Sequence, residues 1–232
     1  MYAAAFITIA IVLMLQGIIS YTFAQSITGK SIIGAFPLES KPYGLTYGDW
    51  TGKWWQWDVS IPKDQNPGGD STGKYCGQKQ VGPVWFLTGT FGGSATRTCD
   101  IPAGKAILLS LINSQCNYLT KPNLKTNSQL LACAKSLNEG ITKLDATIDG
   151  VKIPELQKYR VQSQPFTIVY GPNNVDGAPI GTTKAVSDGY WVLLKPLPAG
   201  NHTIHFAGAV VNYVQGTLNN FANEVTYNVN VK

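Results

Sequence analysis

Short apolar segments separated by turn residues follow one another from residue 82 to the C-terminus, and this spacing restricts the fold more than any other feature of the sequence. Residues 82–90 and 105–112 are apolar on both faces, as expected of strands at the centre of a sheet. Residues 225–231 alternate apolar side chains with Thr and Asn, which is the period of a strand with one buried face. The pattern predicts a mainly β fold, an antiparallel β-sandwich or a jelly roll.

A tryptophan-rich helix is predicted to precede the strands, at residues 46–59. Its first residues have the spacing of a capping box, in which Thr46 and Asp49 satisfy each other's free backbone amides. Three tryptophans then recur along one helix face, at positions Trp50, Trp54 and Trp57. We expect this stripe to pack on the body of the protein, but aromatic rings also stack on sugar faces. Trp55 lies off the stripe. Because of this stacking ability, Trp55 and Trp57 are both candidate ligand-binding residues.

The N-terminus is an apolar stretch without Lys or Arg, and it is followed by the small residues Thr22 and Ala24. Residues 1–24 are therefore expected to be a cleaved signal peptide, with a retained N-terminal anchor as the alternative. Either reading places the rest of the chain outside the cytoplasm, secreted or anchored to the outer face of the cell membrane. We expect an extended segment at residues 25–45 and a single disulfide-stapled β-sandwich domain at residues 46–232.

All four cysteines follow the leader: Cys76, Cys99, Cys116 and Cys133. An even number of cysteines in an exported chain favours disulfides over metal ligation, and no Cys-x-x-Cys pair is present. Four cysteines allow three pairings, of which we expect the sequential one, Cys76 with Cys99 and Cys116 with Cys133. A second, short helix is predicted at residues 126–137, and Cys133 would tie it to the body of the protein.

The net charge of +5 comes from basic residues that are scattered singly and form no run. A nucleic-acid-binding tract is therefore not expected. Weak attraction to acidic glycans or to an anionic cell surface fits this charge distribution. Contact with a membrane is expected only through the N-terminal segment, if that segment is not cleaved.

The loop that follows the first helix contains three oxygen ligands of the kind that calcium prefers, Asp64, Asn66 and Asp70. Tyr75 stands where a calcium loop of the helix-loop-helix type requires a bidentate glutamate. A solvated turn is therefore favoured, and calcium is retained as the one cofactor that the sequence suggests.

Two histidines are present, and their spacing on a strand places them on opposite faces. His202 shares its face with Ile204 and Phe206, so we expect it to be a hydrogen-bonded structural residue. His205 points to the other face and is a candidate ligand-binding residue. The chain has no nucleophile elbow and no nucleotide-binding loop, and its aspartates lie mostly in turns. An enzyme is therefore less expected than a binding protein.

Asn201-His-Thr203 is a glycosylation sequon in a predicted turn. Because such a turn is exposed to solvent, Asn201 is a candidate site for an N-linked glycan in a host that modifies exported proteins.

Two groups of residues resemble known proteins. Residues 197–206, together with the closing strand at 225–227, resemble the last hairpin of immunoglobulin-like surface domains. A longer set is similar to a family of exported hypothetical proteins with no assigned activity: residues 54–57, 82–87, 101–105 and 188–191. The first resemblance implies a β-sandwich. The second implies export, and it brings no catalytic residues that could be carried over to this chain.

These features favour an exported, non-catalytic binding protein for a glycan or another cell-surface component, which can also form homo-oligomers. Two alternatives remain open. One is a secreted hydrolase that uses aspartates, with or without calcium. The other is a structural subunit of an extracellular layer or fibre, in which residues 26–36 add a strand to the sheet of a neighbouring molecule.

Overall fold

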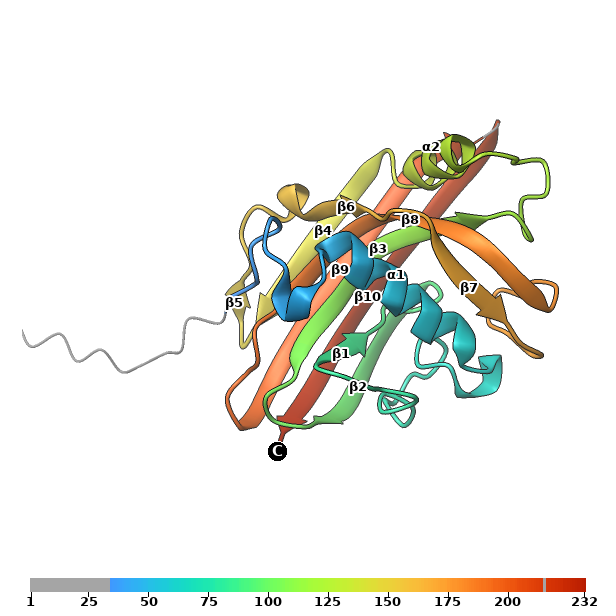
Figure 1. The fold of residues 1–232 in the computed structure, drawn as a ribbon. Coiled ribbons are helices and arrows are strands. Elements are labelled where there is room, and N and C mark those ends of the chain that lie inside the picture. Colours follow the sequence, from blue (N-terminus) through green and yellow to red (C-terminus); the bar gives the residue numbers. More distant parts are fainter. Residues whose placement is uncertain (1–33, 215) are drawn as a thin grey trace, which may run out of the picture. The chain divides into compact units, whose positions relative to one another are not determined.

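A computed structural model describes residues 34–214 and 216–232. The expected signal peptide and the first part of the expected extended segment lie outside these residues. The described residues form one compact unit that contains two β-sheets and two α-helices (Figure 1). The predicted mainly β fold, a sandwich with a tryptophan-rich helix and a short inserted helix, is therefore confirmed.

The first sheet has the strand order β1-β3-β8-β6, and a fifth strand, β7, also pairs with β8. Its strands are β1 (Val84–Leu87), β3 (Ala106–Asn117), β6 (Arg160–Gln162), β7 (Phe166–Tyr170) and β8 (Gly181–Leu194). The N-terminal segment adds to this sheet, because the amide of Phe36 donates to the carbonyl of Leu193 at 2.8 Å.

The second sheet has the order β2-β10-β9-β4-β5. Its strands are β2 (Gly93–Ile101), β4 (Ile141–Ile148), β5 (Val151–Lys152), β9 (Gly200–Val214) and β10 (Thr217–Val231). The described residues also contain three short 3-10 helices, at Pro42–Gly44, Lys63–Gln65 and Leu156–Tyr159.

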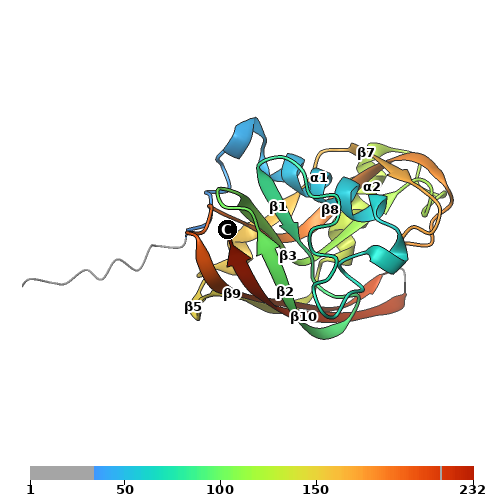
Figure 2. The ribbon, with the colours of Figure 1, turned by 90° about the horizontal axis from the view of Figure 1, so that it is seen from below.

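The first sheet lies between the second sheet and helix α1 (Tyr47–Ser60), so the molecule has three layers (Figure 2). One core fills the space between the sheets, and a second core forms where the tryptophans of α1 pack on the other face of the first sheet. This double coverage explains why β3 is apolar on both faces. The second sheet has one face in the core, and β10 shows the expected alternation of buried and more exposed residues.

Helix α1 begins and packs as the sequence predicts. The hydroxyl of Thr46 accepts from the amide of Asp49 at 3.1 Å, and the Asp49 carboxylate accepts from the amide of Thr46 at 2.9 Å. This reciprocal cap satisfies two amides that a helix start leaves free. The tryptophans of the stripe are all buried, with exposed fractions of 5% for Trp50, 4% for Trp54 and 6% for Trp57. The expectation that the stripe packs inward is confirmed.

Both expected disulfides are present. Cys76 is bonded to Cys99, which ties the loop after α1 to β2, and Cys116 is bonded to Cys133, which ties helix α2 (Asn127–Leu137) to β3. Helix α2 also begins with a capping box, formed by Thr126 and Gln129. Each disulfide thus ties a segment outside the sheets to a strand.

The structure differs from the sequence prediction in two strands. The polar composition of residues 171–188 predicts a loop, but β8 begins at Gly181, because its first residues pair with β7. Strand β2 was not predicted, and its inward face carries the buried guanidinium of Arg97. That guanidinium donates to four backbone carbonyls and to the hydroxyl of Tyr227.

Strand pairing is antiparallel except at β1–β3 and β2–β10, which are parallel. Between β1 and β3 the chain crosses to the second sheet as β2, and it returns to the first sheet in its original direction. Strand β10 lies between β2 and β9 and pairs with both of them.

Candidate functional site

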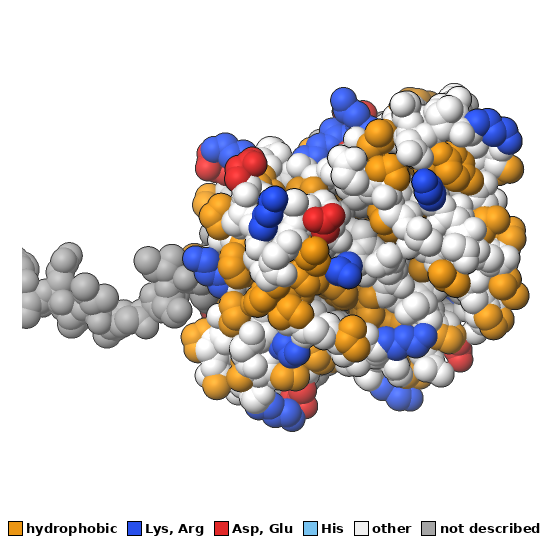
Figure 3. Space-filling model, viewed as in Figure 1, with side chains coloured by type: hydrophobic (Ala, Val, Ile, Leu, Met, Phe, Trp, Pro, Cys, Tyr) orange, Lys and Arg blue, Asp and Glu red, His pale blue; other side chains and the backbone are white. Residues whose placement is uncertain are grey.

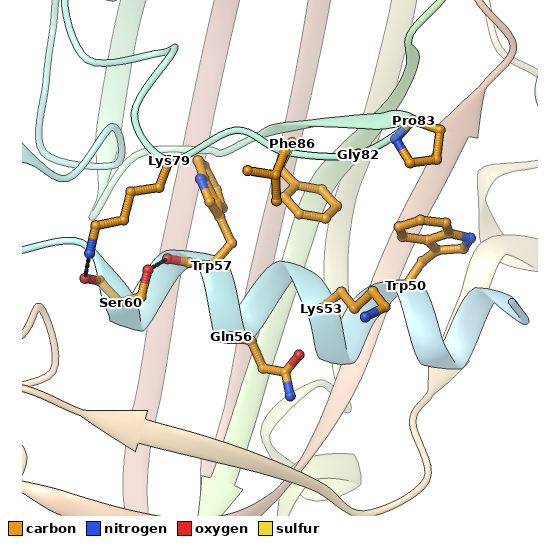
Figure 4. A pocket seen from close by; sticks show the side chains of 10 residues that line it. Trp50, Lys53, Gln56, Trp57, Ser60, Lys79, Gly82, Pro83 and Phe86 are labelled. Atoms are coloured by element: carbon orange, nitrogen blue, oxygen red, sulfur yellow. Dashed lines mark hydrogen bonds between the residues drawn. The ribbon is translucent and has the colours of Figure 1, made fainter. Parts of the chain in front are cut away.

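A groove of about 380 Å³ runs along α1, between this helix and the segment at residues 78–83 (Figure 4). Its volume falls within the range of small-molecule sites, roughly 300–1,000 Å³. The residues that shape it come from α1, from that segment and from β1: Trp50, Lys53, Trp57, Lys79, Val81 and Phe86.

The floor of the groove is aromatic. Trp50 and Trp57 rise from α1 toward Phe86 on the opposite wall, and the ring centroids of Trp57 and Phe86 lie 5.5 Å apart. The indole N–H of Trp50 donates to the carbonyl of Pro42 at 3.0 Å, and that of Trp57 donates to the carbonyl of Gln78 at 2.7 Å. Because these polar groups are already satisfied by the protein, the small part of the ring surface that stays exposed in the groove is mainly apolar.

In the wall opposite α1, residues 78–83 precede β1 and have no regular secondary structure, yet they are held in place by several contacts. The side-chain amide of Gln80 donates to the carbonyl of Phe86 at 2.8 Å and accepts from the amide of Phe86 at 3.0 Å, which imitates a pair of strand hydrogen bonds. The disulfide of Cys76 holds the preceding loop, and the ammonium of Lys105 donates to the carbonyl of Gly82. Val81 is left 78% exposed at the mouth of the groove.

Polar groups lie around this apolar floor. The ammonium of Lys79 donates to the carbonyl of Ser60, so it is held across one end of the groove. Lys53 is exposed on the helix beside Trp50, and the amide of Gln56 donates to the carbonyl of Thr167 on β7 at 2.8 Å. On the face that carries α1, hydrophobic side chains gather near the middle, with Lys and Arg side chains spread around them (Figure 3).

The three candidate ligand-binding residues do not meet at one site. Trp57 lines the groove, so its buried position and a role in ligand contact are compatible. Trp55 is half-buried, with its ring 5.2 Å from that of Trp54, and it packs between two of the hydrophobic clusters instead of lining the groove. His205 lies on the outer face of the second sheet.

The surroundings of His205 are polar and include two carboxylates. Its Nδ1 is 3.1 Å from the hydroxyl of Thr226, and its Nε2 is 3.7 Å from Asp145 and 3.8 Å from Glu224. The other histidine, His202, has the expected structural role, with Nδ1 at 2.8 Å from Asp149 and Nε2 at 2.9 Å from the carbonyl of Pro198. Partial burial lowers the pKa of His202, but these two hydrogen bonds outweigh it and raise the pKa.

The residues of the expected calcium loop serve separate turns. Asp64 accepts from the side chain of Asn173 at 2.8 Å, whereas buried Asn66 donates to the carboxylate of Asp58 at 3.1 Å. Asp70 accepts from the amides of Thr72 and Tyr75. Within residues 34–214 and 216–232, no group of three or more His, Cys, Asp or Glu side chains is arranged to hold a metal ion. The calcium hypothesis gains no support from this geometry.

Asn201 lies at the start of β9, not in the turn that the sequence predicts, and it is exposed. The sequon is therefore accessible, and glycosylation of Asn201 remains a prediction.

Sequence reasoning missed Lys53, Lys79 and Phe86 as groove residues. For Lys53 the sequence does contain a signal, because its spacing from Trp50 and Trp57 puts all three residues on one side of a helix. No comparable signal exists for the other two, because they reach the groove only through tertiary contacts.

Comparisons with known proteins do not identify the chain. No family model matches it, and no curated protein matches it. A cysteine protease inhibitor from Entamoeba histolytica, EhICP2, is similar in structure at a TM-score of 0.22 and 15% identity, over 63% of this chain and 94% of that one. At that TM-score the likeness says nothing about function.

The two disulfides are typical of an extracellular protein. Neither α-helix in the described part of the chain has the length and hydropathy needed to cross a bilayer.

Proposed function

We propose that the protein is an exported, non-catalytic binding protein that holds a glycan in the groove along α1. The observation that carries this proposal is the aromatic floor formed by Trp50, Trp57 and Phe86 within a cavity of about 380 Å³. A sugar ring has an apolar C–H face that stacks on aromatic surface, and its hydroxyl groups need polar partners at the edge. The ammonium groups of Lys53 and Lys79 supply such partners along the groove.

The hydrolase alternative has less support at this site. Glycoside hydrolysis in most families needs a pair of carboxylates that flank the scissile bond. Among the described residues that line the groove, none is Asp or Glu. The carboxylates of Asp145 and Glu224 lie instead on the outer face of the second sheet, beside His205.

The structural-subunit alternative also has less support. It requires the N-terminal segment to add a strand to a neighbouring molecule, but Phe36 and Gly34 already form hydrogen bonds with Leu193 and Lys195 of their own chain.

The proposal is tested by titrating the purified protein with a panel of neutral and acidic oligosaccharides, with calorimetry and tryptophan fluorescence as readouts. Val81→Ser removes exposed apolar surface at the mouth of the groove, and we expect it to weaken binding about fivefold. Val169→Ser is the matched control, because Val169 is 58% exposed on β7 and does not line the groove. Equal affinity of the two variants, or binding of no oligosaccharide, would count against the proposal.

A further inference from the structure

The charged side chains that line the groove are all positive. Two lysines contribute to it from opposite walls, Lys53 from α1 and Lys79 from the segment at residues 78–83. A third, Lys105, donates to the carbonyl of Gly82, which also belongs to the lining. Of the described residues that form this lining, none carries a negative charge. The groove therefore combines an apolar floor with uncompensated positive charge at its rim.

The acidic residue next to this rim is already engaged. Asp49 lies one helical turn before Lys53, but its carboxylate accepts from both the amide and the hydroxyl of Thr46, at 2.9 and 2.6 Å. These hydrogen bonds lower the pKa of Asp49, and the charges of Lys41 and Lys53 lower it further. The side chain of Lys53 remains exposed. Its ammonium is thus free to turn toward an anion in the groove.

We infer that the glycan bound in the groove is an acidic one, in which carboxylates of uronic acid units pair with Lys53 and, at the Ser60 end of the groove, with Lys79, while a sugar ring lies on Trp57 and Phe86. This inference rests on the proposed function and names its ligand class. A neutral sugar would use the aromatic floor but would leave both ammonium groups without an anionic partner. A free carboxylate without a ring would use the ammonium groups but not the floor. A uronic acid uses both.

The test uses two polymers with the same backbone, polygalacturonate and its fully methyl-esterified form. Esterification removes the negative charge and keeps the sugar rings. We expect polygalacturonate to bind at least about tenfold more tightly in low salt, and the difference to shrink as ionic strength rises, because salt screens exposed charges.

Substitutions at Lys53 locate the effect. Lys53→Gln should weaken polygalacturonate binding about three- to tenfold and leave binding of the ester unchanged. Lys53→Arg should retain most of the affinity for polygalacturonate. Lys184→Gln is the matched control, since Lys184 is exposed on β8 and lines no part of the groove. Melting curves should be similar for all three variants, because the two side chains are exposed.

Three outcomes would overturn the inference. Equal binding of the acid and the ester, with loss in Val81→Ser, would overturn it and leave glycan binding in the groove intact. A preference for polygalacturonate over its ester that Lys53→Gln and Lys184→Gln reduce equally would show an effect of net charge alone and would overturn the inference. Binding of neither polymer, nor of any oligosaccharide in the panel, would overturn the inference and the proposed function together.

Discussion

Trp54 occupies the centre of the tryptophan stripe and touches more aromatic rings than its neighbours do. Its ring lies edge-on to those of Trp55, Trp57 and Trp191, at centroid distances of 5.2, 5.8 and 5.3 Å. Its indole N–H donates to the carbonyl of Leu87 at 3.1 Å. Removing this side chain would leave a large cavity between α1 and the first sheet.

We therefore expect Trp54→Ala to lower the free energy of unfolding by about 3–5 kcal/mol, measured by urea denaturation. Trp55→Ala should lower the free energy of unfolding by clearly less, because Trp55 is only half-buried. A Trp54→Ala protein with an unchanged denaturation midpoint would mean that the stripe does not anchor α1.

Asp58 is a buried carboxyl in the last turn of α1. Burial raises its pKa to about 7, against the opposing effect of the hydrogen bond from Asn66, and the nearby charge of Asp176 adds to the increase. In an unfolded chain the same group has a pKa of about 3.9. Between these two values the folded protein holds a proton that the unfolded chain has lost, so stability falls as pH rises.

From this single group, the free energy of unfolding is expected to fall by roughly 1 kcal/mol per pH unit between pH 4 and pH 7. Asp58→Asn keeps the oxygen that accepts from Asn66 but cannot ionise, so its unfolding free energy should depend less on pH across this range. It should also exceed that of the wild type at pH 8. Parallel pH profiles for the two proteins would show that Asp58 does not titrate as described.

The two α-helices are predictable from local sequence because each begins with a capping box and continues with helical spacing of apolar residues. Strand β2 is not predictable in this way. Its inward face carries Arg97 where an apolar residue is expected, and the stability of that buried charge depends on carbonyl groups from distant loops. The first residues of β8 are polar as well, and they form a strand because β7 pairs with them. Local sequence patterns contain no information about the carbonyl groups that accept from Arg97 or about the pairing of β7 with β8.

The groove is predictable on one side only. Helical spacing places Trp50, Lys53 and Trp57 together, and the sequence alone therefore indicates one wall. The other wall depends on the pairing of Gln80 with Phe86 and on the disulfide of Cys76, both of which are tertiary contacts.

The disulfide between Cys116 and Cys133 closes a loop with a sequence separation of 17 and holds α2 against β3. Replacing both cysteines by alanine should lower the free energy of unfolding by about 3 kcal/mol, because the unfolded chain gains freedom. Hydrogen exchange should also become faster in α2 than in α1, which this disulfide does not hold. An equal loss of protection in both helices would indicate a global effect instead of local release of α2.

At the scale of the whole molecule, β10 is the strand that completes the second sheet, since it pairs with β9 on one side and with β2 on the other. It also contributes to the core between the sheets through Val225, Tyr227, Val229 and Val231. A chain that ends at Gly216 loses all of these contacts. We expect it to show no cooperative unfolding transition by circular dichroism.

Lys232→Ala is the control for this truncation, because it keeps the backbone hydrogen bonds of Lys232 with Ile101 and Ala103. The ammonium of Lys232 forms an exposed ion pair with Asp100 at 2.6 Å, and solvent-exposed pairs of this kind contribute little to stability. This control should therefore unfold cooperatively and near the wild-type temperature. A native-like transition in the chain that ends at Gly216 would show that β10 is dispensable.

The parallel pairing of β2 with β10 also determines when the protein can fold during its synthesis. Arg97 on β2 and Tyr227 on β10 are hydrogen-bonded although they are 130 residues apart in sequence. A ribosome therefore finishes β2 long before the strand that pairs with it exists. Before β10 has been synthesised, β2 can be held by earlier segments through the Cys76–Cys99 bond and through the hydrogen bonds from Arg97 to Gly68 and Thr88, and the second sheet is completed only when β10 is present.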